Sequence, residues 1–170
     1  MRILHVFKDY FPPIHGGIEQ TMNRLAVDQA RAGHEVGVLC SAHGGRRTIV
    51  EVVDGVRVVR VAEWGRALSS PLCPTFPLWL RRLGADIVHL QFPNPLGELS
   101  WLLVRPPGAL VVSYQNDIVR QKALLPLYGP FLHALFARAN ALMVSSDRLI
   151  DRSPYLARQR SKCRVVPLGI

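Results

Sequence analysis

The segment that decides the fold is Ile3-Leu-His-Val-Phe7, which is followed by the turn Lys8-Asp-Tyr-Phe-Pro-Pro-Ile14 and by His15-Gly-Gly17. The first five residues form a short apolar run, which is typical of a buried strand, and the charged, proline-rich turn ends it. Apolar residues then recur at helical spacing up to Gly33, which is placed to cap the helix. Glu35-Val-Gly-Val-Leu-Cys40 supplies a second strand. We therefore expect residues 1–40 to form a right-handed βαβ unit on a parallel sheet.

The rest of the chain continues this alternation of strands and helices. Asp54-Gly55 separates two β-branched runs, residues 48–53 and 56–61, and is the strongest hairpin signal in the sequence. Further strands are expected at 85–90, 110–114, 141–145 and 163–167, and helices at 76–83, 96–104 and 124–139. This pattern predicts an α/β fold with a doubly wound, mainly parallel sheet.

Composition limits the class of protein. The chain has 170 residues, 49% of them hydrophobic, which fits one domain with a full core. Its three cysteines are too few and too scattered for a disulfide framework or a paired-cysteine metal site. Charge at Lys8 and Asp9 interrupts the amino end too early for a signal peptide, and no run reaches the roughly 18 apolar residues of a spanning helix. We expect a cytoplasmic protein.

The basic balance of the chain favours anionic ligands in general. The formal net charge is +9, but only three of the 21 basic residues are lysines, and the arginines are spread along the whole sequence. Dispersed basic residues without a nucleic-acid motif do not indicate DNA or RNA binding. We therefore predict no nucleic-acid partner, and phosphate-bearing small molecules or anionic membranes remain open.

Ligands of open α/β sheets bind beyond the carboxyl ends of the strands, so the residues after each strand are candidates. Gly16 and Gly17 precede a predicted helix, where free backbone amides could hold a diphosphate; a simple tight turn is the equally weighted alternative. Asn94 follows the strand predicted at 85–90. The dinucleotide fingerprint and the nucleotide-triphosphate loop motif are both missing, which excludes nicotinamide cofactors and ATP hydrolysis.

A second group of polar residues follows the strand predicted at 110–114. Gln115, Asn116, Asp117, Arg120 and Lys122 could meet sugar hydroxyls and phosphate oxygens at the rim of the crevice. For Asp117 alone, capping of the next helix is the stronger interpretation; for the group as a whole, ligand binding is.

The sequence shows no complete catalytic apparatus. It contains neither a Ser/His/Asp order nor the spacing of a metal site, and no metal or other cofactor is predicted. His5 and His89 lie within apolar strands, so buried, hydrogen-bonded core histidines are the preferred interpretation.

Five motifs in order carry a family resemblance. They are Tyr10-Phe-Pro-Pro-Ile-His-Gly-Gly-Ile-Glu-Gln20, Arg31-Ala-Gly-His-Glu-Val36, Ala85-Asp-Ile-Val-His-Leu-Gln-Phe-Pro-Asn-Pro95, Val111-Val-Ser-Tyr-Gln-Asn-Asp-Ile-Val-Arg-Gln-Lys122 and Val165-Val-Pro-Leu-Gly-Ile170. Together they resemble the amino-terminal half of family 4 (group 1) glycosyltransferases of the GT-B architecture, with the nearest likeness to bacterial mannosyltransferase-type enzymes that build polysaccharides. The resemblance covers essentially the whole chain.

The resemblance implies retaining transfer of a sugar from a nucleotide diphosphate sugar to a glycan or lipid-linked acceptor. In this family two Rossmann-like domains face each other across a cleft, and residues 1–170 would form the single amino-terminal, acceptor-side domain. The carboxyl-terminal domain, with the nucleotide site and a glutamate pair that this chain lacks, would be the missing partner, so we expect no activity from this chain alone. Gly16 and Gly17 would lie by the donor diphosphate.

One position departs from the family pattern. Relatives usually carry a histidine two residues before the aspartate that corresponds to Asp117, whereas this chain has Gln115. Glutamine can exchange hydrogen bonds but has no proton that titrates near neutral pH. By the resemblance, Gln115 and Asp117 are the catalytic candidates, and Asn116, Arg120, Lys122 and Asn94 are candidate donor or acceptor contacts.

Two further hypotheses stay open. The chain could be a non-catalytic module that binds a phosphate or glycan ligand without a second domain. If the acceptor is lipid-linked, Arg81, Arg82 and the stretch 124–138 are candidate contacts to an anionic membrane. An ordinary core-packing helix, broken by Pro126 and Pro130, explains the same stretch equally well.

Overall fold

The computed structural model describes residues 1–67, 69–115 and 125–167. The strands are β1 (Arg2–Val6), β2 (Glu35–Ser41), β3 (Ile49–Val53), β4 (Val56–Val61), β5 (Arg66–Ala67), β6 (Ser70–Pro71), β7 (Ile87–Phe92), β8 (Ala109–Tyr114), β9 (Ala141–Val144) and β10 (Cys163–Val165). The helices are α1 (Gly17–Arg31), α2 (Phe76–Leu83), α3 (Pro95–Val104), α4 (Leu125–Arg138), α5 (Asp147–Arg152) and α6 (Pro154–Ala157), with a 3-10 turn at Arg160–Lys162.

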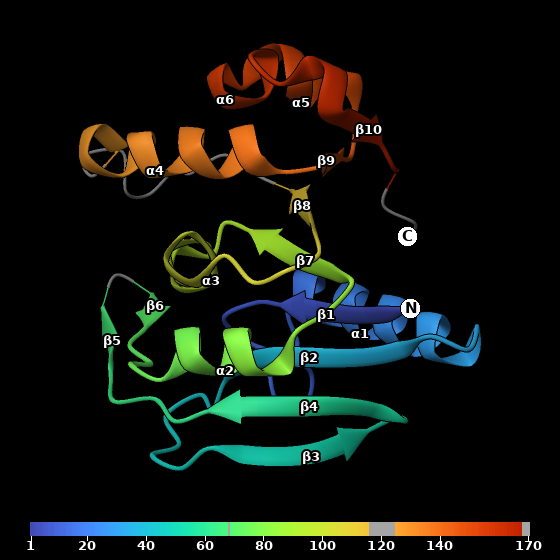
Figure 1. Ribbon diagram of the computed structural model, residues 1–170, viewed down its shortest axis with the longest axis vertical. Coiled ribbons are helices and arrows are strands. Elements are labelled where there is room, and N and C mark those ends of the chain that lie inside the picture. Colours follow the sequence, from blue (N-terminus) through green and yellow to red (C-terminus); the bar gives the residue numbers. More distant parts are fainter. Residues whose placement is uncertain (68, 116–124, 168–170) are drawn as a thin grey trace.

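The central sheet confirms the predicted doubly wound α/β fold. In the described residues it has eight strands in the order β10-β9-β8-β7-β1-β2-β4-β3 (Figure 1). Neighbouring strands are parallel except for β3, which pairs with β4 as an antiparallel hairpin. The chain runs outward from β1 through β2 to β4 and returns to place β7 on the other side of β1. The strand order therefore reverses between β1 and β7, the kind of position where such sheets bind ligands.

Two local signals are confirmed by the backbone. Asp54 and Gly55 have φ angles of 50° and 83°, and two positive φ angles are what a two-residue hairpin turn requires. At the end of α1, Gly33 has a φ of 86°, and its N–H donates to the carbonyl of Ala30 while that of His34 donates to Gln29. This pair of bonds is the usual glycine-based helix ending, and it directs the chain into β2.

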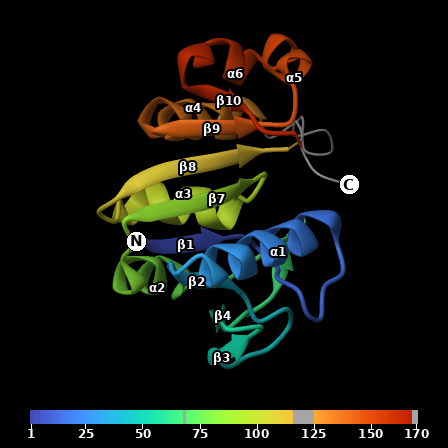
Figure 2. The ribbon, with the colours of Figure 1, turned by 90° about the vertical axis from the view of Figure 1, so that its right-hand side faces the viewer.

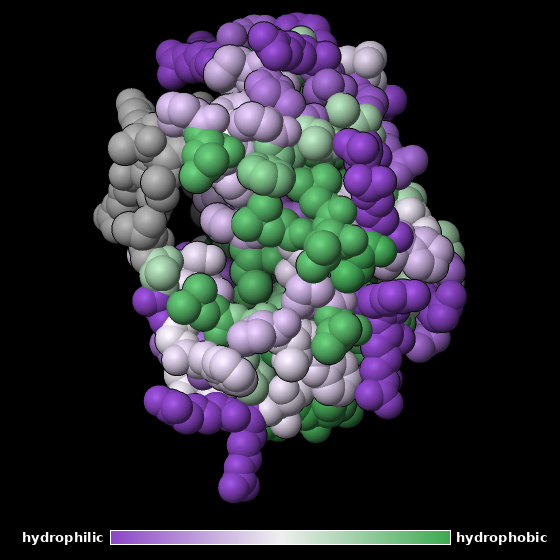
Figure 3. All heavy atoms as spheres, turned by 60° about the vertical axis from the view of Figure 1, so that its left-hand side comes forward, coloured by the Kyte–Doolittle hydropathy of each residue, from purple (hydrophilic) through white to green (hydrophobic). Residues whose placement is uncertain are grey.

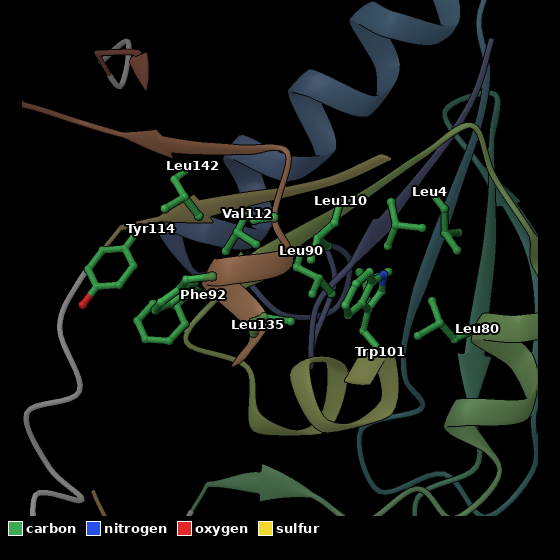
Figure 4. Close-up of a cluster of buried hydrophobic side chains, with 14 of the residues drawn as sticks. Leu4, Leu80, Leu90, Phe92, Trp101, Leu110, Val112, Tyr114, Leu135 and Leu142 are labelled. Carbon is green, nitrogen blue, oxygen red and sulfur yellow. The ribbon is translucent and has the colours of Figure 1, made fainter. Parts of the chain in front are cut away.

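Helices cover the sheet unequally on its two faces. Figure 2 looks onto the face that α1 covers, and α2, α3 and α4 lie behind the sheet. Met22 and Ala26 of α1 belong to one buried cluster, together with residues of β2 and β4. On the other face, Leu80, Trp101 and Leu135 from α2, α3 and α4 converge on the sheet (Figure 4). This second cluster is the larger, and it extends to α5 and α6.

Some expectations about elements were wrong. The strand predicted at 85–90 runs from Ile87 to Phe92. Helical spacing around Leu135 favours packing of Phe131 as well, but Phe131 is 47% exposed. The short pair β5 and β6 follows no pattern that sequence analysis singled out, because two-residue strands leave no periodicity to detect. Among the described residues no helix combines the length and apolarity needed to cross a lipid bilayer.

We expect Leu90→Ala to lower the free energy of unfolding by about 2–5 kcal/mol, because it opens a cavity in the middle of the larger cluster. Leu103→Ala is the matched control: the same atoms are removed, but Leu103 is 74% exposed, so a change within about 0.5 kcal/mol is expected. Urea unfolding of both variants measures the difference. Equal losses would contradict this placement of the core.

Candidate functional site

A pocket opens at the carboxyl ends of the strands next to the reversal of strand order. Its volume is about 160 Å³, and it lies between α1 and the ends of β7, β8 and β9. The lining residues are Thr21, Met22, Leu25, Gln91, Ser113, Tyr114, Gln115, Met143, Val144, Ser145, Val166 and Pro167. None of these described lining residues carries a charge. The pocket therefore offers amide and hydroxyl groups on a largely apolar wall.

Gln115, the residue that departs from the family pattern, is held in place by a neighbouring strand. Its Nε2 donates to Oε1 of Gln91, at 3.1 Å, from the end of β7. Gln91 is buried, and its own Nε2 lies 3.5 Å from Nε2 of His89. Because Gln91 engages the amide nitrogen of Gln115, the Oε1 of Gln115 is the atom left to accept a hydrogen bond from a ligand.

The two histidines behind the pocket are buried in the sheet, as predicted. Nε2 of His89 lies 2.7 Å from Oγ of Ser113, and Nε2 of His5 lies 2.7 Å from Oε1 of Gln29. Burial, with a smaller contribution from the neighbouring His5, lowers the pKa of His89 to about 3. Burial also lowers the pKa of His5, against the opposing bond to Gln29. Both rings are therefore neutral near pH 7, and the back of the pocket is polar without charge.

The two glycines of the first loop have different surroundings. Gly16 precedes the first residue of α1, and the carboxylate of Glu19 lies where a side chain at Gly16 would be. Glu19 sits in the first turn, where the helix dipole favours an acid. At Gly17, by contrast, an added Cβ would meet no atom within 4 Å. Open space at the start of α1 therefore lies at Gly17, and a diphosphate contact there stays a prediction.

The start of the first loop is fixed by a cluster of charges that sequence analysis missed, in which two buried acids meet the more exposed Arg66. Arg66 donates to Asp9 at 2.6 Å and to Glu63 at 2.7 Å, and Ser41 donates to Glu63 at 3.0 Å. Burial would raise the pKa of Asp9, but hydrogen bonds from Arg66 and His43 outweigh it and hold that pKa below its usual value. The pKa of Glu63 is lowered in the same way, chiefly by Arg66 against the effect of burial.

This cluster joins the carboxyl ends of three strands, since Asp9 and Glu63 lie within three residues of the ends of β1 and β4, Ser41 ends β2, and Arg66 begins β5. A charged residue immediately after a buried strand is the signal that could have found it. Across residues 1–67, 69–115 and 125–167 no group of three or more histidine, cysteine, aspartate or glutamate side chains is placed to hold a metal ion. Both acids of the cluster form ion pairs with Arg66.

Two more contacts hold the middle of the first loop. The Tyr10 hydroxyl donates to Oδ1 of Asn23 on α1, at 2.6 Å. Nη2 of Arg60 donates to the carbonyl of Pro12 at 2.6 Å, while its Nε donates to Glu51 at 2.6 Å. The loop that leads to Gly17 is thus anchored to α1 and to β4.

Asn94 has a structural role in addition to its predicted one. It is fully buried before α3, and its Oδ1 accepts from the Gly97 N–H at 3.3 Å. Its backbone N–H donates to Oε1 of Glu98 at 2.5 Å, and in the described part of the chain its Nδ2 has no hydrogen-bond partner. The other predicted contacts, Asn116, Asp117, Arg120 and Lys122, lie outside the described residues and stay predictions.

Glu98 is a buried acid that sequence analysis did not select. It accepts hydrogen bonds from the Tyr128 hydroxyl of α4 and from the Asn94 N–H, and it ties α4 to α3. Burial outweighs both bonds and raises the pKa of Glu98 to about 7. The carboxyl group therefore stays protonated in the folded chain at a pH where an ordinary glutamate is ionised.

This raised pKa predicts a pH dependence of stability. Glu98 loses its proton near 4.5 when the chain is unfolded but only near 7 when it is folded, so its contribution is complete below pH 4.5 and is lost as the pH rises to about 7. We expect a fall of about 3 kcal/mol in the free energy of unfolding over that range, which Glu98→Gln abolishes. Urea unfolding at several pH values measures it, with the exposed Glu35→Gln as control. Parallel pH curves for wild type and Glu98→Gln would refute this assignment.

Comparison with known proteins identifies the family. A sequence profile described as "Glycosyl transferase 4-like domain" matches residues 16–169. The chain is 31% identical over 172 residues to the O-antigen chain mannosyltransferase C of Escherichia coli, covering 100% of this chain and 46% of that protein. It is 30% identical over 177 residues to the D-rhamnosyltransferase WbpZ of Pseudomonas aeruginosa, covering 100% of this chain and 45% of that protein.

The fold has counterparts among solved structures. The sucrose-phosphate synthase of Thermosynechococcus elongatus superimposes with a TM-score of 0.71 at 16% identity, over 99% of this chain and 48% of that one. The chain thus spans about half the length of the curated relatives it matches, and it aligns with about half of this GT-B synthase. With its fold, its pocket at the strand ends and these matches, the chain belongs to the glycosyl transferase 4-like family.

Proposed function

We propose that this chain is the acceptor-side half of a retaining glycosyltransferase that acts in the cytoplasm. It would help to move a mannose-like sugar from a nucleotide diphosphate sugar to a glycan or lipid-linked acceptor. The two relatives, a mannosyltransferase and a rhamnosyltransferase, support a hexose or deoxyhexose donor. A second domain, corresponding to the other half of these relatives, would hold the nucleotide, so the chain alone would be inactive.

The observation that carries the proposal is the uncharged pocket beside the reversal of strand order. Gln115 presents its amide oxygen there, and such an oxygen accepts a hydrogen bond from a sugar hydroxyl. Gln91 and Ser113 line the same wall with polar groups that already bond Gln115 and His89. The neutral His89 behind them leaves the wall without a net charge. A charged ligand group would find no counter-charge among the described lining residues, whereas a neutral sugar ring needs none.

The donor diphosphate would bind outside this uncharged pocket, at the start of α1. Its negative charge would be met by backbone amides at the open start of α1, at Gly17 with Gly16 beside it, and by Arg120 and Lys122. In this scheme no metal ion or other cofactor takes part.

The remaining candidates contact the sugars. Asp117 and Gln115 would face the transferred sugar, with the Oε1 of Gln115 as an acceptor for one of its hydroxyls. Asn116 would contribute a further contact to the donor or acceptor, whereas the fully buried Asn94 offers a ligand no exposed atom.

The test uses the complete reading frame that contains this chain. We expect it to transfer radiolabelled mannose from a nucleotide diphosphate mannose to a polysaccharide or lipid-linked acceptor, and residues 1–170 alone to transfer none. A complete protein that is inert toward a broad panel of nucleotide sugars would contradict the proposal. Micromolar sugar-phosphate binding by residues 1–170, together with that inertness, would favour the non-catalytic binding module instead.

Gly17→Val tests the diphosphate contact without disturbing the fold. Because a side chain at Gly17 meets nothing within 4 Å, we expect unchanged thermal stability, but an apolar group now stands where the anion would approach. The KM for the donor should rise about tenfold, roughly the value of one hydrogen bond to a charged group. Gly65→Val, at another glycine with open space around it, is the matched control and should leave KM unchanged. A donor KM that Gly17→Val does not alter would remove Gly17 from the site.

A further inference from the structure

The outer surface of the helix layer opposite α1 carries large apolar side chains that stay exposed among the described residues. Figure 3 shows this side, with hydrophobic groups gathered across its middle. Leu127 of α4 is 76% exposed and Leu103 of α3 is 74% exposed. Six residues of this layer, including the segment that leads into α2, are exposed: Leu72, Leu78, Leu99, Leu103, Leu127 and Phe131. We call these six residues the leucine face.

A groove runs through the leucine face. It lies between α3 and the segment from β6 to the start of α2, and its volume is about 360 Å³. Its wall is mostly apolar, with Leu72, Leu96, Leu99 and Leu103 among the lining residues. The face is therefore a broad, grooved hydrophobic surface, in contrast to the scattered single apolar residues found on most protein surfaces.

The exposed charges carried by the helices of the leucine face have one sign. The sequences of α2, α3 and α4 contain one acidic residue, Glu98, which is buried between α3 and α4. Exposed arginines end each of the three helices: Arg81 and Arg82 on α2, Arg105 after α3 and Arg138 on α4. On the opposite side of the sheet, α1 balances its acidic residues Glu19 and Asp28 with Arg24 and Arg31.

We propose that the leucine face docks on an anionic lipid bilayer. Its leucines and Phe131 would enter the boundary between head groups and acyl chains, and the arginines at its rim would meet lipid phosphates. Such a surface needs both apolar area and basic residues, because either alone binds a membrane weakly. The leucine face takes in two residues of the stretch 124–138, its rim takes in Arg81 and Arg82, and α3 is added to the contacts predicted from sequence.

The helix α4 runs from Leu125 to Arg138 without the break that was expected at Pro126 and Pro130, and it has one buried and one exposed side. Leu132 and Leu135 are buried against the sheet, while Leu127 and Phe131 are exposed on another side of the same helix. Docking would bring the chain to the surface where a lipid-linked acceptor resides. The role of docking in sugar transfer rests on the proposed function. Membrane binding itself requires no sugar transfer.

The test is sedimentation of the 170-residue chain with lipid vesicles. We expect binding to vesicles of phosphatidylcholine mixed with phosphatidylglycerol, little binding to phosphatidylcholine alone, and weaker binding as salt is raised. Absence of binding to the anionic vesicles at low salt would overturn the proposal. Sugar transfer to a water-soluble acceptor is assayed separately, so a failure of docking and a failure of the transferase proposal are distinguishable.

Charge variants distinguish binding through the rim of the leucine face from attraction by the net positive charge of the chain. Arg81→Gln with Arg82→Gln should weaken anionic-vesicle binding about fivefold for each arginine removed. Arg46→Gln with Arg47→Gln removes the same charge from an exposed loop before β3 and should have a much smaller effect. Equal losses in the two double variants would refute the assigned surface and leave only non-specific attraction.

Apolar variants test the other half of the face. Leu99→Ser with Leu103→Ser should reduce vesicle binding at least tenfold with only a small change in thermal unfolding, since Leu103 is 74% and Leu99 42% exposed. Val50→Ser with Val52→Ser, on the edge strand β3, is the matched control and should leave binding unchanged. Size-exclusion chromatography adds one more outcome: a dimer that the leucine variants dissociate, with no vesicle binding, would assign the face to a second copy and overturn the proposal.

Discussion

In the central strands β1, β7 and β8 the side chains are buried on both faces, because parallel strands joined by helical crossovers need helices above and below the sheet. This double burial is the constraint on which the other features depend. It places α1 on one face and α2, α3 and α4 on the other. It also leaves the strand ends as the part of the sheet that helices do not cover, and there the pocket lies. The leucine face is the outer side of the same covering layer.

Double burial also explains the row of hydrogen-bonded polar side chains behind the pocket. A polar side chain inside such a sheet must find its hydrogen bonds among its neighbours, because water does not reach it. His89 meets Ser113, and Gln91 meets Gln115, across adjacent parallel strands whose register places these residues close together. The charged cluster around Arg66 obeys the same rule at the ends of β1, β2 and β4. The neutral pocket and the anchored first loop follow from polar groups that satisfy one another.

Features that depend on residues close together in the sequence were predicted correctly, and features that depend on distant residues were not. The hairpin at Asp54-Gly55 and the helix ending at Gly33 depend on backbone angles of one or two residues, and both were predictable. The exposure of Phe131 was not, because helical spacing shows which residues share a face but not which face meets the sheet. Arg66 lies 57 residues from Asp9, so no local pattern could join them. Glu98 was passed over for the same reason, since its raised pKa comes from packing between two helices.

The sequence by itself determined the alternation of strands and helices, the doubly wound sheet and the family, because hydrophobic periodicity and turn residues act over a few positions and several motifs occur in order. Tertiary structure alone decided which of the candidate residues meet. It joined Gln91 to Gln115, separated the surroundings of Gly16 from those of Gly17, and gathered exposed leucines of three helices on one surface. The physical reason is that burial, hydrogen-bond pairing and pKa shifts depend on neighbours brought together from distant parts of the chain, and these neighbours exist only once the sheet has formed.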